Sequence, residues 1–522
     1  MKIKSMLCAS LIATLAFSGY NVQRAQAKQT NYRKVMTKMP GTKTFGIYKT
    51  ISGNKPKGKI TNTSYFKYSH IETSTKRTTK NGTYWYIAIN GRNVGWVNQN
   101  WFQRNKISAV KKISLVRDWT DGGGHNYTDK FKTLDAVNWV TDSTGTVLDN
   151  SKITASDSTL TASTPGTKTV TLTCGKAKAS IQVTVRENPT EGSASLLSIS
   201  KFGKGSSKAN PPKTHFGSSP NYKNSITNKP ETINQKFSLQ SNAFNISFTT
   251  KFYQPVRFSF DSDEGGNKIN NVGHINEGMT MHDKWLFVSL LGKESDMQGH
   301  VVGYNLSKMN RTYAQRLRSM PMKKFQQYCK NIKVSPLVLT GHGQAMGSSS
   351  KYVYLIANNH KTASSNEPIR LVQLNRSNME MNSITTFRIA AGSKNRYIHN
   401  AYIGSDNKLY AIFRNGGSKN YEFWSVTKQS NGEWVPKQDA GMTGQFVKNG
   451  SPVQGFAYDI PNGNYYVAFN DYIFRVDSKG KLVATYGSMG FGREIEGIAV
   501  NNGRLYVNLA QRAQLVESNP LK

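Results

Sequence analysis

The stretch GHINEGMTMHDKWLFVSL, residues 273–290, contains a pattern that the chain repeats four more times. A polar residue is followed by a small residue, a short gap with a turn, and an alternating apolar run. The five polar–small pairs are Glu277-Gly278, Gln344-Ala345, Asn400-Ala401, Gln454-Gly455 and Glu496-Gly497. Their spacings of 67, 56, 54 and 42 residues are typical of propeller blades with loop insertions. Because such a unit cannot bury its own faces, neighbouring units must stack. The sequence therefore predicts a five-bladed β-propeller in residues 191–522.

The polar residue of each repeat predicts a ring around a central channel. The first strand of a propeller blade lines the channel, so Glu277, Gln344, Asn400, Gln454 and Glu496 are expected at equivalent depths. Ring closure places Glu277 beside Glu496. Two neighbouring carboxylates can hold a cation such as Ca²⁺ or share a proton. The alternative is that the ring only hydrogen-bonds channel water and strand ends. No other cofactor is expected.

Residues 1–27 have the pattern of a secretory signal peptide. Lys2 and Lys4 precede the apolar run MLCASLIATLAFSG, and AQA at 25–27 fits a small-x-small cleavage site. The apolar run is too short to span a membrane, and no later stretch is long and apolar enough. The sequence predicts a secreted, extracellular protein without a transmembrane segment.

The chain is strongly basic, with a formal net charge of +39. Outside a cell, the available polyanions are phosphate-bearing wall polymers, acidic glycans and anionic lipid, so nucleic acid is not the expected partner. Beyond the signal peptide only Cys174 and Cys329 remain, in different predicted domains. A disulfide framework is therefore not expected.

Residues 28–105 carry 15 Lys or Arg against one acid, Glu72. The segment ends in a predicted hairpin, GTYWYIAINGRNVGWV, with an Asn90-Gly91 turn. The G-T-Y-W-Y strand, this turn, the Gly95-Trp96 dipeptide and the closing aromatic resemble the GW module of Gram-positive surface proteins. The resemblance implies a small β-barrel that binds wall polymers such as teichoic acids. The wall-binding candidates are Lys76, Arg77, Lys80, Tyr84, Trp85, Arg92, Trp96 and Trp101.

The charge of this segment agrees with that implication, because clustered cations release counterions from a polyphosphate. The alternative is that Trp85 and Trp96 are core residues and that the lysines form a solvated face.

Residues 106–190 are predicted to be a β-sandwich spacer. GTKTVTLTCGKAKASIQVTV reads as two alternating strands, and the region resembles bacterial immunoglobulin-like domains. Residues 189–195 are expected to form a linker, and residues 201–230 a loop. NAFNISFTTKF is expected to be a strand that closes the propeller ring with the last blade.

Other features of the propeller region have plain interpretations. DSDEGGN at 261–267 lacks a calcium loop's twelfth ligand, so we expect a turn. Residues 322–332 predict a short helix packed on the propeller, the alternative being a membrane-touching helix. His274, His342 and His399 stand at different offsets from the ring positions, so a shared metal site is not expected.

The propeller region also resembles a bacteriocin family. GHINEGMTM, TGHGQAMGSSSKYVYLIAN and REIEGIAVNNGRLYVNL are similar to the helveticin J-like class III bacteriocins of lactobacilli. The resemblance implies killing of related Gram-positive bacteria. Together with the basic module, it predicts an antibacterial protein that attaches to Gram-positive walls and acts on the envelope of related bacteria. It supplies no catalytic residues. The alternatives are a wall-glycan hydrolase on a five-bladed propeller and a non-lethal wall-associated adhesin.

Overall fold

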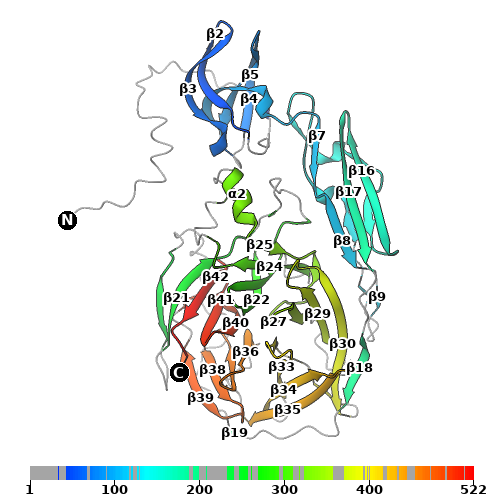
Figure 1. Ribbon diagram of the computed structural model, residues 1–522, viewed down its shortest axis with the longest axis vertical. Coiled ribbons are helices and arrows are strands. Elements are labelled where there is room, and N and C mark those ends of the chain that lie inside the picture. Colours follow the sequence, from blue (N-terminus) through cyan, green and yellow to red (C-terminus); the bar gives the residue numbers. More distant parts are fainter. Residues whose placement is uncertain are drawn as a thin grey trace, which may run out of the picture.

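The computed structural model describes residues 33–34, 43–66, 71–89, 91–116, 119–120, 126–127, 130–186, 192–198, 207–208, 232–239, 246–256, 260, 269–292, 298–309, 317, 322–356, 369–391, 394–396, 398, 400–415, 420–431, 434–443, 453–470, 472–487, 491–510 and 512–521. Their regular structure is almost all β-strand, arranged in three units along the chain (Figure 1). The predicted signal peptide, the stretch 261–267 and His399 lie outside the described residues.

The first unit is one six-stranded sheet wrapped around its own core. Its strands, in sheet order, are β1 (Arg33–Lys34), β4 (Ile71–Thr79), β5 (Gly82–Ile89), β6 (Arg92–Asn98), β2 (Gly46–Ser52) and β3 (Lys55–Asn62). Short 3₁₀ turns follow at η1 (Thr63–Tyr65) and η2 (Gln99–Trp101). Side chains join the β2–β3 hairpin to β4 and the turn that follows it. Arg77 Nη1 donates to Ile51 O at 2.7 Å, and Asn81 Nδ2 donates to Asn54 O at 2.9 Å. Side-chain hydrogen bonds thus connect the β2–β3 hairpin to β4 and the β4–β5 turn in the predicted small barrel.

The second unit is a β-sandwich, as predicted. One sheet contains β13 (Val147–Leu148), β12 (Val137–Thr141) and β7 (Lys106–Ala109); the other contains β14 (Thr154–Ala155), β16 (Gly166–Cys174), β17 (Ala177–Arg186) and β8 (Lys112–Val116). Two small sheets pair β9 (Trp119–Thr120) with β10 (Asn126–Tyr127), and β11 (Lys130–Lys132) with β15 (Thr159–Thr161). The 3₁₀ turns are η3 (Thr133–Ala136) and η4 (Asn150–Lys152).

A buried contact joins the sandwich to the propeller. Ile269, on the chain leading into the first blade, packs in the sandwich core, and its N–H donates to Asp135 O at 3.3 Å. His300 Nε2 of the first blade lies 2.8 Å from Ile269 O, and its Nδ1 lies 2.9 Å from Ser335 O. The two units therefore share buried side chains.

Five sheets form the third unit. The first blade holds β22 (Ile275–His282), β23 (Trp285–Leu291), β24 (Gln298–Asn305), β25 (Ile332–Val334) and β26 (Val338–Leu339). The second holds β27 (Ala345–Ser348), β28 (Tyr352–Ile356), β29 (Ile369–Asn375), β30 (Met381–Ala391), β31 (Lys394–Arg396) and β18 (Gly192–Ser198). The third holds β32 (Asn400–Ile403), β33 (Leu409–Asn415), β34 (Asn420–Lys428), β35 (Trp434–Thr443) and β19 (Ser207–Lys208).

The remaining two blades complete the circle. The fourth holds β36 (Gly455–Asp459), β37 (Asn464–Ala468), β38 (Tyr472–Asp477) and β39 (Leu482–Gly487). The fifth holds β40 (Ile495–Asn501), β41 (Arg504–Leu509), β42 (Gln514–Ser518), β21 (Ile246–Tyr253) and β20 (Lys236–Leu239). The innermost strands, β22, β27, β32, β36 and β40, each contact the next, and β40 contacts β22 (Figure 1). The predicted five-bladed propeller is confirmed, as is its closure by the strand within NAFNISFTTKF.

Two outer strands differ from the sequence expectation. Residues 192–198, which begin within the expected linker, form β18, which pairs in parallel with β30. Residues 207–208 form β19, which pairs in parallel with β35. Main-chain hydrogen bonding to an open sheet edge explains both, because it needs no apolar side-chain pattern in the added strand.

Glycines allow the innermost strands of neighbouring blades to approach closely. A Cβ added at Gly278 would lie 2.3 Å from Gly343 O, and one at Gly347 would lie 2.3 Å from Ile403 N. At Gly497 it would lie 2.8 Å from a backbone nitrogen of β22. Backbone atoms cannot give way as a flexible side chain can. In three repeats the small residue, Gly278, Gly455 or Gly497, is therefore the residue that meets the backbone of the next blade. In the second blade this residue is Gly347, two positions beyond the repeat's Ala345.

The predicted helix is α2 (Met322–Cys329). Phe325 and Tyr328 are buried in one cluster with Tyr304 of β24. This confirms the prediction of a helix packed on the propeller.

We expect Gly347→Ala to destabilise the propeller. The new methyl meets backbone at 2.3 Å, and overpacking of this kind costs about 1–3 kcal/mol. Gly292→Ala is the matched control, because a Cβ there meets nothing within 4 Å. Thermal unfolding of both variants measures the difference, and equal melting temperatures would contradict the close-approach argument.

Candidate functional site

The barrel presents a row of aromatic side chains on its outer surface. Tyr48 of β2 pairs with Trp96 of β6, which pairs with Tyr86 of β5. The Tyr86 and Trp96 rings lie 5.4 Å apart. Their sequence neighbours Ile47 and Val97 are fully buried, so strand alternation turns Tyr48 and Trp96 to the opposite, outer face.

Exposed cations extend this row and lie elsewhere on the barrel surface. Lys59 of β3 pairs with Tyr48 and extends the row by one strand. Within the described part of the barrel the one acid is Glu72. The exposed basic side chains of this part are Lys43, Lys49, Lys55, Lys57, Lys59, Lys76, Arg77, Lys80, Arg92 and Arg104. A polyanion that crosses β3, β2, β6 and β5 would meet both charge and ring faces.

Several predicted wall-binding residues lie on the surface. Lys76, Lys80 and Arg92 are exposed. Lys76 Nζ lies 6.0 Å from the centre of the Trp85 ring, which packs partly against the core. Arg77 is exposed but donates to Ile51 O, so it also serves the barrel itself.

Trp101 and Tyr84 correct the sequence-based list. Trp101 is 0% exposed and Tyr84 is 6% exposed, so neither can present a ring to a polymer. Trp101 ends the 3₁₀ turn η2 and fills the barrel core. Sequence reasoning missed Tyr48 and Lys59, which become visible only when the strand order places β2 between β3 and β6.

At the propeller centre, the predicted ring residues divide into different roles. Asn400 is buried and bridges two blades, since its Nδ2 donates to Val453 O at 3.0 Å. Its Oδ1 accepts from the N–H of Ala401 at 2.8 Å. Its amide therefore holds the third and fourth blades together.

Gln344 and Gln454 form a hydrogen-bonded chain across the channel. Gln344 Nε2 donates to Gln454 Oε1 at 2.5 Å, although the two residues lie at the second and fourth blades. Gln454 Nε2 donates to Glu494 Oε1 at 2.7 Å, and Asn470 Nδ2 donates to the same oxygen at 3.1 Å. Glu494 is an acid at the ring that the repeat pattern did not select, because the polar position of the fifth repeat is Glu496, two residues later.

Glu277 and Glu496 lie on neighbouring strands, as the closure argument predicts. Glu277 is 3% exposed and Glu496 is 8% exposed. Glu277 Oε2 is 3.6 Å from His342 Nε2, and Glu277 O accepts from Asn508 Nδ2 at 3.0 Å. The sequence argument did not join His342 to Glu277. A carboxylate beside an imidazole can hold a proton or contribute to a cation site.

Comparison with known families identifies the first two units. Residues 26–103 match the GW (Gly-Tryp) dipeptide domain. The GW module predicted from the sequence is confirmed. Residues 126–185 match the bacterial Ig-like domain (group 3), which confirms the immunoglobulin-like spacer. A GW module fits association of this chain with a cell wall. No curated protein matches the chain by sequence.

Solved structures similar to the chain include three bacterial proteins. They are a gluconolactonase from Xanthomonas campestris (11% identity, 56% of this chain and 98% of that one, TM-score 0.31), a catalytically inactive virginiamycin B lyase from Staphylococcus aureus with quinupristin (10%, 56% and 83%, 0.28) and BamB from Moraxella catarrhalis (10%, 55% and 98%, 0.23). At these TM-scores the likenesses say nothing about function.

None of the helices among the described residues has the length and apolar character needed to cross a membrane. Within the same ranges, no three or more His, Cys, Asp or Glu side chains gather as metal ligands.

We expect the double variant Glu277→Gln/Glu496→Gln to fold, because three of the five ring positions already carry Gln or Asn. If the two carboxylates hold a cation, calcium raises the melting temperature of the wild-type protein and not that of the double variant. Melting curves with calcium and with a chelator measure this, and Glu380→Gln provides a matched charge change outside the ring. A wild-type protein with no calcium response leaves the ring as channel lining.

Proposed function

We propose that this protein is a secreted, wall-attached antibacterial protein whose barrel binds anionic wall polymers such as teichoic acids. The observation that carries the proposal is the outer face of the barrel. It combines the Tyr48–Trp96–Tyr86 row with many exposed cations and one acid among the described residues. Polyphosphate chains are bound by this combination through counterion release, with ring faces available to polyol or sugar units.

The sandwich fits the role of a spacer, and the propeller that of the part that acts on the envelope. The resemblance of the blade sequences to helveticin J-like bacteriocins supports an antibacterial action on related Gram-positive bacteria. The polar chain through Gln344, Gln454 and Glu494 offers a recognition surface at the channel.

Wall-glycan hydrolysis is the rival activity, because Glu277, Glu494 and Glu496 gather around one channel. A glycosidase needs two carboxyl groups at a defined separation, roughly 5–9 Å depending on stereochemistry. Glu494 Oε1 already accepts hydrogen bonds from Gln454 and Asn470, so this oxygen is engaged by the protein itself.

Replacing Lys49, Lys55, Lys57 and Lys59 with Gln in the full chain should weaken binding to isolated Gram-positive walls and make it less sensitive to salt. Each lost phosphate contact lowers the slope of log affinity against log salt by roughly 0.7. The matched control replaces the exposed Lys152, Lys176, Lys178 and Lys408 with Gln. Co-sedimentation with walls across a salt series measures both. Wild-type binding that persists unchanged in molar salt would instead indicate stacking on sugars.

Purified protein should kill sensitive lactobacilli without releasing soluble sugars from their walls. Viable counts and reducing-sugar release, measured on the same samples, test this. Released sugars that disappear with a single Glu277→Gln or Glu496→Gln change would establish the hydrolase instead. Binding without killing or digestion would leave an adhesin.

A further inference from the structure

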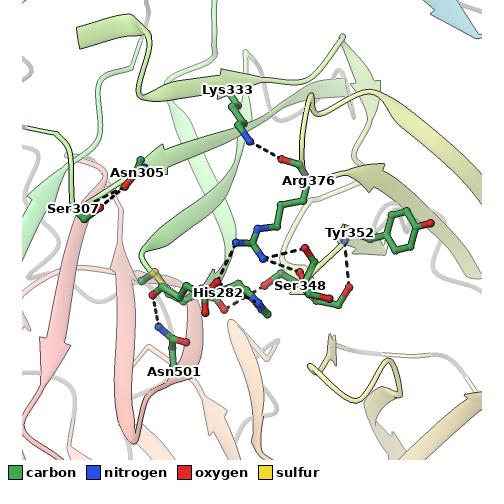
Figure 2. Close-up of polar contacts among 12 residues, drawn as sticks. His282, Asn305, Ser307, Lys333, Ser348, Tyr352, Arg376 and Asn501 are labelled. Carbon is green, nitrogen blue, oxygen red and sulfur yellow. Dashed lines mark hydrogen bonds and ion pairs between the residues drawn. The ribbon is translucent and has the colours of Figure 1, made fainter. Parts of the chain in front are cut away.

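A groove of 480 Å³ lies between the first two propeller blades, at the far end of their inner strands from the polar ring. It is built from the turns β22–β23, β27–β28 and β29–β30, together with β25 (Figure 2). The β22–β23 turn at Asp283 lies six residues beyond Glu277, about 20 Å along an extended strand. The groove is therefore separate from the channel ring.

Its lining is cationic and aromatic. The eight lining residues include Lys333, Lys351 and Arg376, the aromatic Trp285 and Tyr352, and no carboxylate. The other three, Ser350, Asn375 and Ser377, supply hydroxyl and amide groups. Such a mixture suits a ligand that carries negative charge and hydroxyl groups together.

Arg376 is fixed in place by its neighbours. Its Nη1 donates to Ser349 O at 3.3 Å and to Ser350 O at 3.2 Å, and its Nη2 pairs with Asp283 Oδ2 at 3.1 Å (Figure 2). The Arg376 side chain is 17% exposed, whereas that of Asp283 is 68% exposed. Because Asp283 is largely in water, it screens the partly buried guanidinium incompletely.

Lys333 is held by the main chain of Arg376. Its Nζ donates to Arg376 O at 2.9 Å and lies 4.5 Å from the centre of the Trp285 ring. Burial and the charge of Arg376 lower the pKa of Lys333. An ammonium has three N–H donors, and within the described residues the Lys333 ammonium donates one hydrogen bond, to Arg376 O. Lys333 and Arg376 thus place two cationic side chains in the lining of one groove.

Stacking keeps Trp285 in position. Its ring stacks on Phe287 with centres 6.0 Å apart and planes 12° apart. Gly303 of the next strand leaves room for this arrangement, since a Cβ there would lie 2.7 Å from the Phe287 ring. The groove therefore has a fixed aromatic wall beside its cations, as sites for sugars and polyols do.

We propose that this groove binds a phosphodiester-linked polyol or sugar unit, with the phosphate between Lys333, Lys351 and Arg376 and the polyol against Trp285. The site gives the propeller its own contact with an anionic polymer. It goes beyond the proposed function, because it requires no contribution from the barrel.

The test is protection of lysines from acetylation in the full-length chain, read peptide by peptide by mass spectrometry. The probe is glycerophosphoglycerol, a soluble phosphodiester with a polyol on each side. We expect it to slow acetylation of Lys333 and Lys351 with one common half-saturation, and to leave the exposed Lys408 of the third blade unaffected. Unchanged rates at Lys333 and Lys351 would overturn the proposal, whatever happens at the barrel lysines.

Variants locate the contact. Lys333→Met should weaken protection of Lys351 by about tenfold, the effect of one charge-assisted hydrogen bond. Lys351→Met, an exposed change that leaves the fold intact, should weaken protection of Lys333 to a similar degree. The matched control Lys408→Met should leave both protections unchanged. Equal protection in all three variants would show that the probe binds elsewhere.

Two further probes separate the chemical alternatives. Inorganic phosphate should protect less well than the diester, because it has no polyol to pack on Trp285, and Trp285→Leu should abolish this difference. Equal protection by phosphate would overturn the polyol part of the proposal. Protection by phosphatidylglycerol vesicles but not by the soluble diester would overturn it in favour of a membrane contact.

Discussion

The propeller depends on the close approach of its innermost strands. Gly278, Gly347 and Gly497 each place a Cα where any side chain would strike the backbone of the next blade. This contact sets the radius of the ring. It also makes the channel narrow enough for Gln344 to reach Gln454 across a blade. At Gly278 and Gly497 the small residue of the repeat therefore sets the spacing between blades, whereas in the second blade Gly347, two positions beyond Ala345, has this role.

The sequence predicted the fold well because each repeat contains both the inner strand of a blade and the apolar strand that pairs with it. A polar residue followed by Gly or Ala and an alternating apolar run gave the number of blades and the inner strand of each. It could not predict β18 and β19, because strands that add to an edge are held by main-chain hydrogen bonds and need no side-chain pattern.

The candidate sites were predicted less completely, and the reason is geometric. The barrel motif identified the surface residues Trp96 and Lys76 but also selected Trp101, whose position in a 3₁₀ turn places it in the core. In the ring, the repeat pattern predicted the polar positions but not their hydrogen-bond partners, such as Glu494, which accepts from Gln454. The groove beside Trp285 joins turns from two blades, and no local sequence pattern contains that arrangement.

Closure of the ring also sets the order in which the molecule can be made. The last blade combines β40, β41 and β42 with β21, and Ser247 bonds Asn519 across 272 positions of sequence. During synthesis, the partner strand β42 of β21 is made only after the other four blades. The inner strands β22 and β40 cannot contact each other before then. Contacts this distant in sequence slow folding and leave open sheet edges exposed. The propeller is thus prone to aggregate until it is complete. Pairing of its final strand, β42, with β21 covers the last open sheet edges of the ring.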